Sequence, residues 1–71
     1  MPDKTIEIED CNCLGESEKA CLIELGDDCR KAGEAVWIPK SQIHDDSEVW
    51  KKGQVGKLVI TEWIAEQKGL I

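Results

Sequence analysis

The chain has 71 residues and a formal net charge of −6, and it contains three tryptophans but no Phe or Tyr. A length below about 80 residues supports one small hydrophobic core, so residues 1–71 are predicted to form a single domain. The acidic excess, which lies in residues 1–30, argues against a nucleic-acid-binding protein, because such binding depends on Lys and Arg contacts with phosphates.

Strands are predicted where apolar and polar residues alternate between Gly and Pro boundaries. These segments are residues 4–9, 19–25, 34–38 and 56–60, with a polar turn at 14–18 between the first two. Val49 and Trp50 are a candidate start for a fifth strand. The segment 34–38 is apolar on both faces, which predicts a central strand that is covered on both sides. Pro39 ends it, because proline has no N–H for a β-ladder.

A short helix is predicted at the C-terminus, with a signal at each end. Thr61 is a candidate N-cap, and Gly69 is suited to the left-handed conformation that closes a Schellman motif. Leu70 would then fold back onto the last turn. A helix this short is unstable alone, so we expect it to dock on the sheet through Trp63 and Ile64, with the Trp63 ring in the core.

These elements together predict a mainly β fold with one short C-terminal helix. The sheet is expected to be a small twisted antiparallel sheet, or a partly open barrel, of four to five strands. Ile43 is predicted to plug the end of this sheet or barrel. The three tryptophans are expected at the edge of the core, because a buried indole N–H needs a hydrogen-bond partner.

Four cysteines raise the question of a metal site. Their spacing is C-x-C-x7-C-x7-C, which contains only one close pair, whereas structural zinc sites usually have two. We therefore expect ordinary thiols and no cofactor. The alternative is a zinc-binding protein whose ligands are Cys11, Cys13 and Cys29, together with Cys21 or His44.

No arrangement typical of a catalytic site is visible, so the protein is predicted not to be an enzyme. His44 is the only histidine, and nothing in the sequence places a nucleophile beside it. A contact surface is a better candidate for function. Its candidate residues are Trp37, Lys40, Ser41, Gln42 and His44, with Asp27 and Asp28 as an acidic contribution. The competing interpretation packs Trp37 under the helix, against Trp63.

The sequence also bears on location. No stretch approaches the ~18 apolar residues of a membrane span. Residues 1–5 lack the basic and apolar regions of a signal peptide, so we expect a cytoplasmic protein without membrane association.

Residues 19–23 read K-A-x-L-I, residues 35–43 contain W-I-P-x-S-Q-I, and residues 62–70 read E-W-I-A-x-x-K-G-L. In these segments the chain resembles a group of small uncharacterised proteins of phages and prophages. The resemblance implies no known activity, and it favours a small accessory protein that binds a host or phage component. Our first hypothesis is therefore a non-enzymatic protein-binding module, such as a phage accessory protein or an inhibitor of a host system. The zinc-binding protein is the second hypothesis, and a small barrel that binds nucleic acid is the third.

Overall fold

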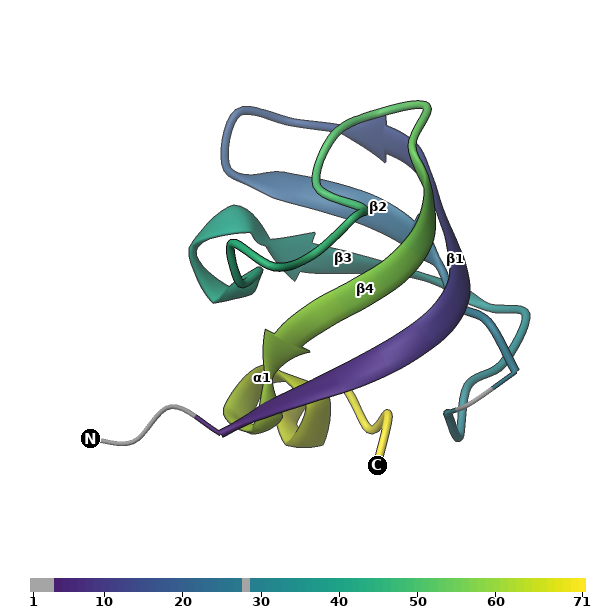
Figure 1. Cartoon of the computed structure of the whole chain (residues 1–71), viewed down its shortest axis with the longest axis vertical. Helices are drawn as coiled ribbons and strands as arrows, with labels where there is room; N and C mark the ends of the chain where they lie inside the picture. The colour runs from purple at the N-terminus through teal and green to yellow at the C-terminus, as the bar shows by residue number, and fades with distance from the viewer. Residues whose placement is uncertain (1–3, 28) are drawn as a thin grey trace.

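The computed structural model describes residues 4–27 and 29–71, and it is a curled four-stranded antiparallel sheet with one short helix (Figure 1). The mainly β fold predicted from the sequence is confirmed. The strand order is β3-β2-β1-β4. The elements are β1 (Thr5–Glu16), β2 (Ala20–Glu24), β3 (Ala35–Pro39), the 3-10 helix η1 (Lys40–Gln42), β4 (Val55–Thr61) and α1 (Glu62–Gln67). Neither helix in this part of the chain has the length and apolar character needed to cross a membrane.

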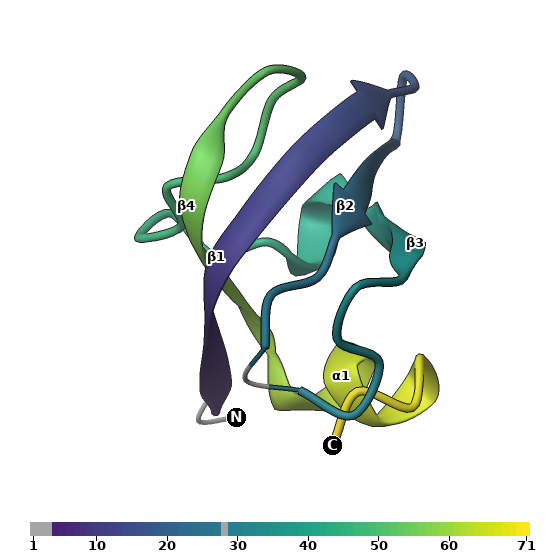
Figure 2. The same ribbon diagram turned by 90° about the vertical axis from the view of Figure 1, so that its right-hand side faces the viewer.

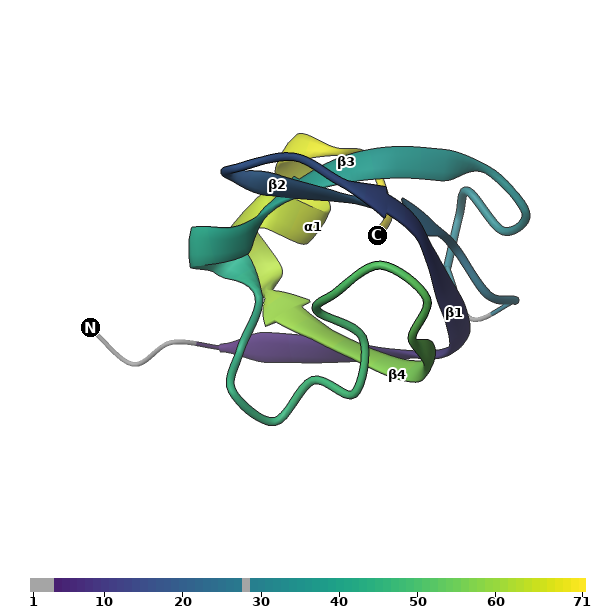
Figure 3. The same ribbon diagram turned by 90° about the horizontal axis from the view of Figure 1, so that it is seen from above.

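Strand β1 is the longest element and bends the sheet. Its pairing with β4 shifts register between Ile8 and Cys11, where Asp10 has a φ of 58°, and its pairing with β2 shifts again between Cys13 and Gly15. Bulges of this kind increase the local twist. As a result, β4 and the first part of β1 lie on one side of the molecule, whereas β2 and β3 lie on the other side (Figures 2 and 3).

The residue range predicted for this first strand, 4–9, is too short. Residues 4–9 alternate regularly, but β1 continues to Glu16 and takes in part of the predicted turn at 14–18. The register shifts allow the strand to keep pairing after the alternation is lost. Cys11 and Cys13 thereby point into the core.

The core is aliphatic and rich in thiols. Its fully buried members include Ile8, Ile23, Ile38, Leu58, Ile60, Val49, Leu70, Cys11, Cys13 and Cys21. All three tryptophans lie outside it, with exposed fractions of 47% for Trp37, 53% for Trp50 and 59% for Trp63. The expectation that Trp63 is a core residue is therefore wrong. Helix α1, at one end of the curled sheet (Figures 1 and 2), docks through Ile64 and Ala65 instead.

Strand β3 is an edge strand, so the prediction of a central strand is also wrong. Ile38 is buried and Val36 is half-buried, whereas Ala35 and Trp37 point outward and are exposed. Only the face that carries Val36 and Ile38 is therefore covered, although the residues on both faces of this segment are apolar. Pro39 ends the strand as predicted, and η1 follows it directly.

The segment between η1 and β4 forms no regular strand. Val49 is fully buried, but it lies in a loop, so the fifth strand predicted at Val49 and Trp50 is absent. Ile43 forms an isolated antiparallel bridge with Ile60 of β4 and packs against the core. Ile43 is thus partly buried along the outer edge of β4.

Both predicted helix caps are confirmed. The Thr61 hydroxyl accepts a hydrogen bond from the N–H of Ile64 at 3.2 Å. At the other end Gly69 has a φ of 73°, and the N–H of Leu70 donates to the carbonyl of Ala65 at 2.8 Å. Leu70 is fully buried, so the Schellman motif anchors the C-terminus in the core.

Replacing Gly69 by alanine is expected to lower the free energy of unfolding by about 1 kcal/mol, because a Cβ disfavours positive φ. Urea denaturation would measure the change. Gly69→Asn provides the control, since asparagine tolerates the left-handed region and should lose less stability. Equal stability of Gly69→Ala and the wild-type protein would contradict the role assigned to this cap.

Candidate functional site

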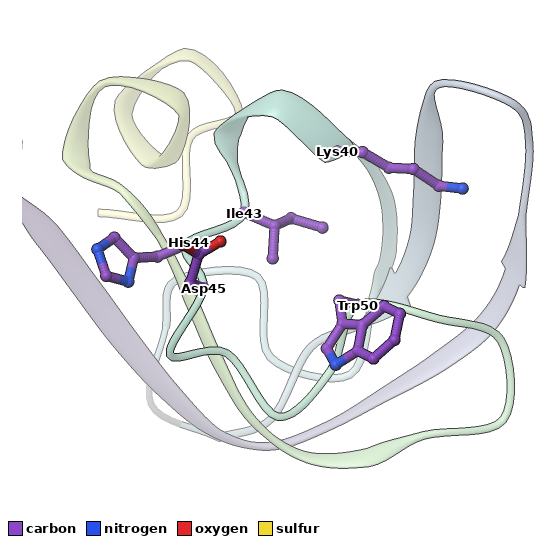
Figure 4. Close-up of a pocket in the computed structure, with 5 residues that line it drawn as sticks. All are labelled: Lys40, Ile43, His44, Asp45 and Trp50. Carbon is purple, nitrogen blue, oxygen red and sulfur yellow. The ribbon is translucent and has the colours of Figure 1, made fainter.

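A groove of about 360 Å³ lies beside the segment that follows β3. Figure 4 shows its lining residues, and Ile43 points between Lys40 and Trp50, while the His44 ring is directed away from them. A smaller hollow of about 180 Å³ adjoins it and is lined by Ser41, Gln42, Ile43, His44, Asp45 and Thr61. The groove combines apolar surface from Ile43 and Trp50 with charged groups at its rim.

Trp50 presents its ring on a backbone that is fixed on both sides. Its N–H donates to the side-chain oxygen of Gln54 at 2.9 Å, and its carbonyl accepts from the thiol of Cys21 at 3.3 Å. The turn that follows is paired with β1, because the N–H of Cys13 donates to the Gln54 carbonyl and the N–H of Gly53 donates to the Cys13 carbonyl. An exposed indole therefore stands on a well-anchored loop.

Lys40 forms one charged wall of the groove. Its ammonium group lies 2.7 Å from the carboxylate of Glu16, at the far end of β1. The hydrogen bond raises the pKa of Lys40 and lowers that of Glu16. The backbone N–H of Lys52 and the charge of Lys51 lower the pKa of Glu16 further. The charges of two lysines, Lys40 and Lys51, thus act on this single carboxylate.

The other side of the groove carries His44 and Asp45. The backbone N–H of His44 donates to the Val59 carbonyl at 2.8 Å, which fixes the residue next to β4. Nδ1 of the ring accepts a hydrogen bond from the N–H of Asp46 at 3.1 Å, so the neutral ring carries its proton on Nε2. Asp45 also lines the groove. The two walls therefore differ in the sign of their charge.

The four cysteines do not assemble the proposed zinc site. Each thiol donates to a different backbone carbonyl: Cys11 to Ile8, Cys13 to Gly15, Cys21 to Trp50 and Cys29 to Gly26. Within residues 4–27 and 29–71, no group of three or more His, Cys, Asp or Glu side chains is placed to hold a metal ion. The ligand sets considered for zinc, including the one with His44, are thus not brought together.

Burial keeps two of these thiols protonated. It raises the pKa of Cys11, and it is the main reason that the pKa of Cys21 is raised to about 11, with the neighbouring Cys13 adding to the effect. The thiolate is the nucleophilic form of cysteine. Cys21 therefore serves as a hydrogen-bond donor that supports the Trp50 loop.

The structure brings together some of the predicted contact residues. Lys40 and His44 line the groove, Ser41 and Gln42 line the adjoining hollow, and Trp37 lies nearby in the chain on the outer face of β3. Trp37 and Trp63 are both exposed, so the predicted burial of Trp37 beneath the helix is wrong.

The predicted acidic contribution is separate from the groove. Asp27 is exposed in the loop that follows β2, across the molecule from η1 (Figure 1). Asp28 lies outside the described residues.

Sequence reasoning missed Trp50 as a site residue. A clue to its exposure is present in the sequence, because Trp50 is followed by Lys51-Lys52-Gly53. Such a polar, glycine-containing stretch is typical of a turn, and a turn lies near solvent. The hydrogen bond between the Cys21 thiol and the Trp50 carbonyl joins residues 29 positions apart, so the local sequence pattern does not predict it.

No protein-family model matches this chain, and searches of curated proteins and of solved structures found no match either.

Proposed function

We propose that the protein is a non-enzymatic protein-binding module that uses the groove formed by Lys40, Ile43, His44, Asp45 and Trp50. One observation carries the proposal: the indole of Trp50 is about half exposed although its backbone is held by hydrogen bonds from both sides. Tryptophan is enriched among the residues that dominate the energy of protein interfaces. A fixed loop also loses little conformational entropy when a partner binds.

The chemistry of the groove suggests which side chains it accepts. Ile43 and Trp50 offer apolar surface for one apolar or aromatic side chain. The charges of Lys40 and Lys51, which both act on Glu16, favour a carboxylate next to that side chain. We therefore propose a partner segment in which an apolar residue is followed or preceded by Asp or Glu.

Two other features support binding over catalysis or nucleic-acid recognition. The Cys21 thiol next to the groove is protonated at neutral pH and already engaged with a carbonyl. The net charge of −6 opposes binding to a polyanion, although an exposed tryptophan near lysines is able to stack on a base. The cytoplasmic location and the relation to phage proteins stay predictions from the sequence.

A peptide-display library panned on the immobilised protein would test this function. We expect enrichment of peptides that combine an apolar side chain with an adjacent acidic residue, and titration of one such peptide should change the tryptophan fluorescence. Trp50→Ala is expected to weaken peptide binding at least tenfold, because hot-spot truncations cost about 2 kcal/mol or more. The variant should fold normally, since the ring is exposed.

Trp63→Ala is the matched control, because Trp63 is equally exposed but lies on α1. It should leave peptide affinity unchanged. A short oligothymidine serves as the competing probe. The absence of an enriched peptide class, or oligothymidine binding that Trp50→Ala abolishes, would contradict the proposed function.

A further inference from the structure

The hollow beside the groove has no role in the proposed function, although the two depressions share part of their lining. Ile43, His44 and Asp45 line both of them, and the hollow extends beyond these residues to Gln42 and Thr61. Its volume of about 180 Å³ is several times the ~30 Å³ that a water molecule occupies in the liquid. A segment bound in the groove is therefore able to place a small polar group in the hollow.

The carboxamide of Gln42 is held in one orientation at this hollow. Its Oε1 accepts a hydrogen bond from the Thr61 hydroxyl at 2.7 Å, and that hydroxyl accepts from the N–H of Ile64. The amide nitrogen, Nε2, donates to no acceptor within residues 4–27 and 29–71. In the same part of the chain, no buried side-chain nitrogen or oxygen lacks a partner, so this nitrogen is accessible. Gln42 thus offers two N–H donors to a ligand.

His44 and Asp45 add another donor and an acceptor. The N–H of Asp46 donates to Nδ1 of His44, so the proton of the neutral ring is on Nε2. This Nε2 forms no hydrogen bond with the described residues. Asp45 is exposed, and its carboxylate forms no ion pair or hydrogen bond with the described part of the chain. The hollow therefore presents unused N–H donors together with an unused carboxylate.

This combination favours a neutral amide over a charged group. A ligand carboxylate would accept from the N–H donors but would lie close to the like charge of Asp45, which is unfavourable. An ammonium group would pair with Asp45 but has no acceptor for the donors of Gln42 and His44. An amide has a carbonyl oxygen for these donors and an N–H for the carboxylate, so the polar groups on both sides keep a partner.

We propose that the hollow is a second subsite of the groove and that it binds an amide group of the partner segment, an inference that rests on the proposed function. The amide carbonyl accepts from Nε2 of Gln42 or of His44, and the amide N–H donates to Asp45. An Asn or Gln side chain and a backbone peptide group share this chemistry.

The subsite also gives the bound segment a direction. Figure 4 shows Lys40 and Asp45 on either side of Ile43. The acidic residue of the segment therefore binds toward Lys40, and its apolar residue packs at Ile43. The amide binds toward Asp45, on the other side of the apolar residue from the acidic one.

A focused peptide-display library tests the subsite on the full chain. Every member keeps an apolar residue next to an acidic residue, and the flanking positions are randomised. We expect Asn and Gln to be enriched, and Asp and Glu depleted, on the side of the apolar residue away from the acidic one. Loss of affinity on replacing the enriched residue by Ala would assign the amide to a side chain, and loss on N-methylation of the flanking peptide bond would assign it to the backbone.

Two negative results are distinguishable. Peptide binding that Trp50→Ala abolishes, but that depends on no flanking amide of either kind, would overturn the subsite and leave the proposed function standing. A library from which no peptide binds would contradict the proposed function itself.

Gln42→Glu tests the donor. Glutamate keeps an oxygen for the Thr61 hydroxyl but has no N–H group. The affinity for the amide-containing peptide should fall about tenfold more than the affinity for the matched peptide that lacks the amide, and this comparison removes the effect of the added charge. Gln67→Glu makes the same change at an exposed position of α1 and should leave both affinities unchanged. Equal losses for the two peptides would overturn the role of Gln42.

Asp45→Asn tests the discrimination against charge. The wild-type protein should bind a peptide with Asn at the flanking position about tenfold more tightly than the same peptide with Asp, and Asp45→Asn should remove most of this preference. Asp27→Asn makes the same change in the loop after β2 and should preserve it. A preference that survives in Asp45→Asn would overturn the assignment of this carboxylate to the subsite.

Discussion

Gly26→Ala is expected to abolish cooperative folding. Gly26 is buried where the loop after β2 crosses β1, and an added Cβ would overlap the carbonyl oxygen of Glu9 and lie 2.9 Å from its carbonyl carbon. Both are backbone atoms, and the strand is already bent there by the positive φ of Asp10. Overpacking usually costs 1–3 kcal/mol, but a backbone overlap leaves no flexible side chain to move away. We expect a loss comparable to the whole stability of so small a domain, about 3–5 kcal/mol.

Circular dichroism with thermal and urea melts would measure this loss. Gly15→Ala is the matched control, because an added Cβ at Gly15 meets no atom within 4 Å and the residue does not have positive φ. That variant should keep or slightly raise the stability, by up to about 1 kcal/mol. A Gly26→Ala protein that melts like the wild type would show that the loop does not approach β1 as closely as described.

Ser47→Ala is expected to lower the free energy of unfolding by about 3 kcal/mol. The side chain is almost completely buried, with 5% exposed. Its hydroxyl donates to the Val49 carbonyl at 2.9 Å and accepts from the N–H groups of Val59 and Val49 at 3.1 and 3.3 Å. Alanine would leave these backbone groups without a partner, and each buried unsatisfied group costs about 1–3 kcal/mol.

Urea denaturation would give the change in stability, and amide exchange at Val59 should become faster at the same time. Ser17→Ala makes the same chemical change at an exposed turn, where the hydroxyl accepts from the N–H of Ala20 at 3.1 Å. Because water can replace that bond, the control should lose about 0.5 kcal/mol or less. Similar losses in the two variants would mean that Ser47 does not hold the loop against β4.

The sequence determined those features whose causes are local. The alternation in β2 set its buried face, Pro39 ended β3, and Thr61 and Gly69 marked the two ends of the C-terminal helix. Each of these signals acts over a few residues, through side-chain periodicity, a missing N–H, a capping hydroxyl or a positive φ. The mainly β class and the helix therefore followed from the sequence.

Part of the candidate site could also be predicted. The sequence predicts Lys40 and His44 as contact residues and Ile43 as an apolar residue of the same segment. All three follow Pro39 closely, so the end of β3 located them in a surface segment. The partner of this segment in the groove, Trp50, was read as the start of a strand.

The tertiary structure alone decided which apolar residues are covered. Trp37 and Trp63 are large apolar residues of the kind that usually fills a core. The curled sheet instead closes around smaller aliphatic side chains and thiols, and both tryptophan rings lie outside it. Strand order made β3 an edge, and this order depends on long-range pairing rather than on the strand's own residues. The groove arose in the same way, because the thiol of Cys21 on β2 fixes the Trp50 carbonyl and so brings the indole beside Ile43 and Lys40.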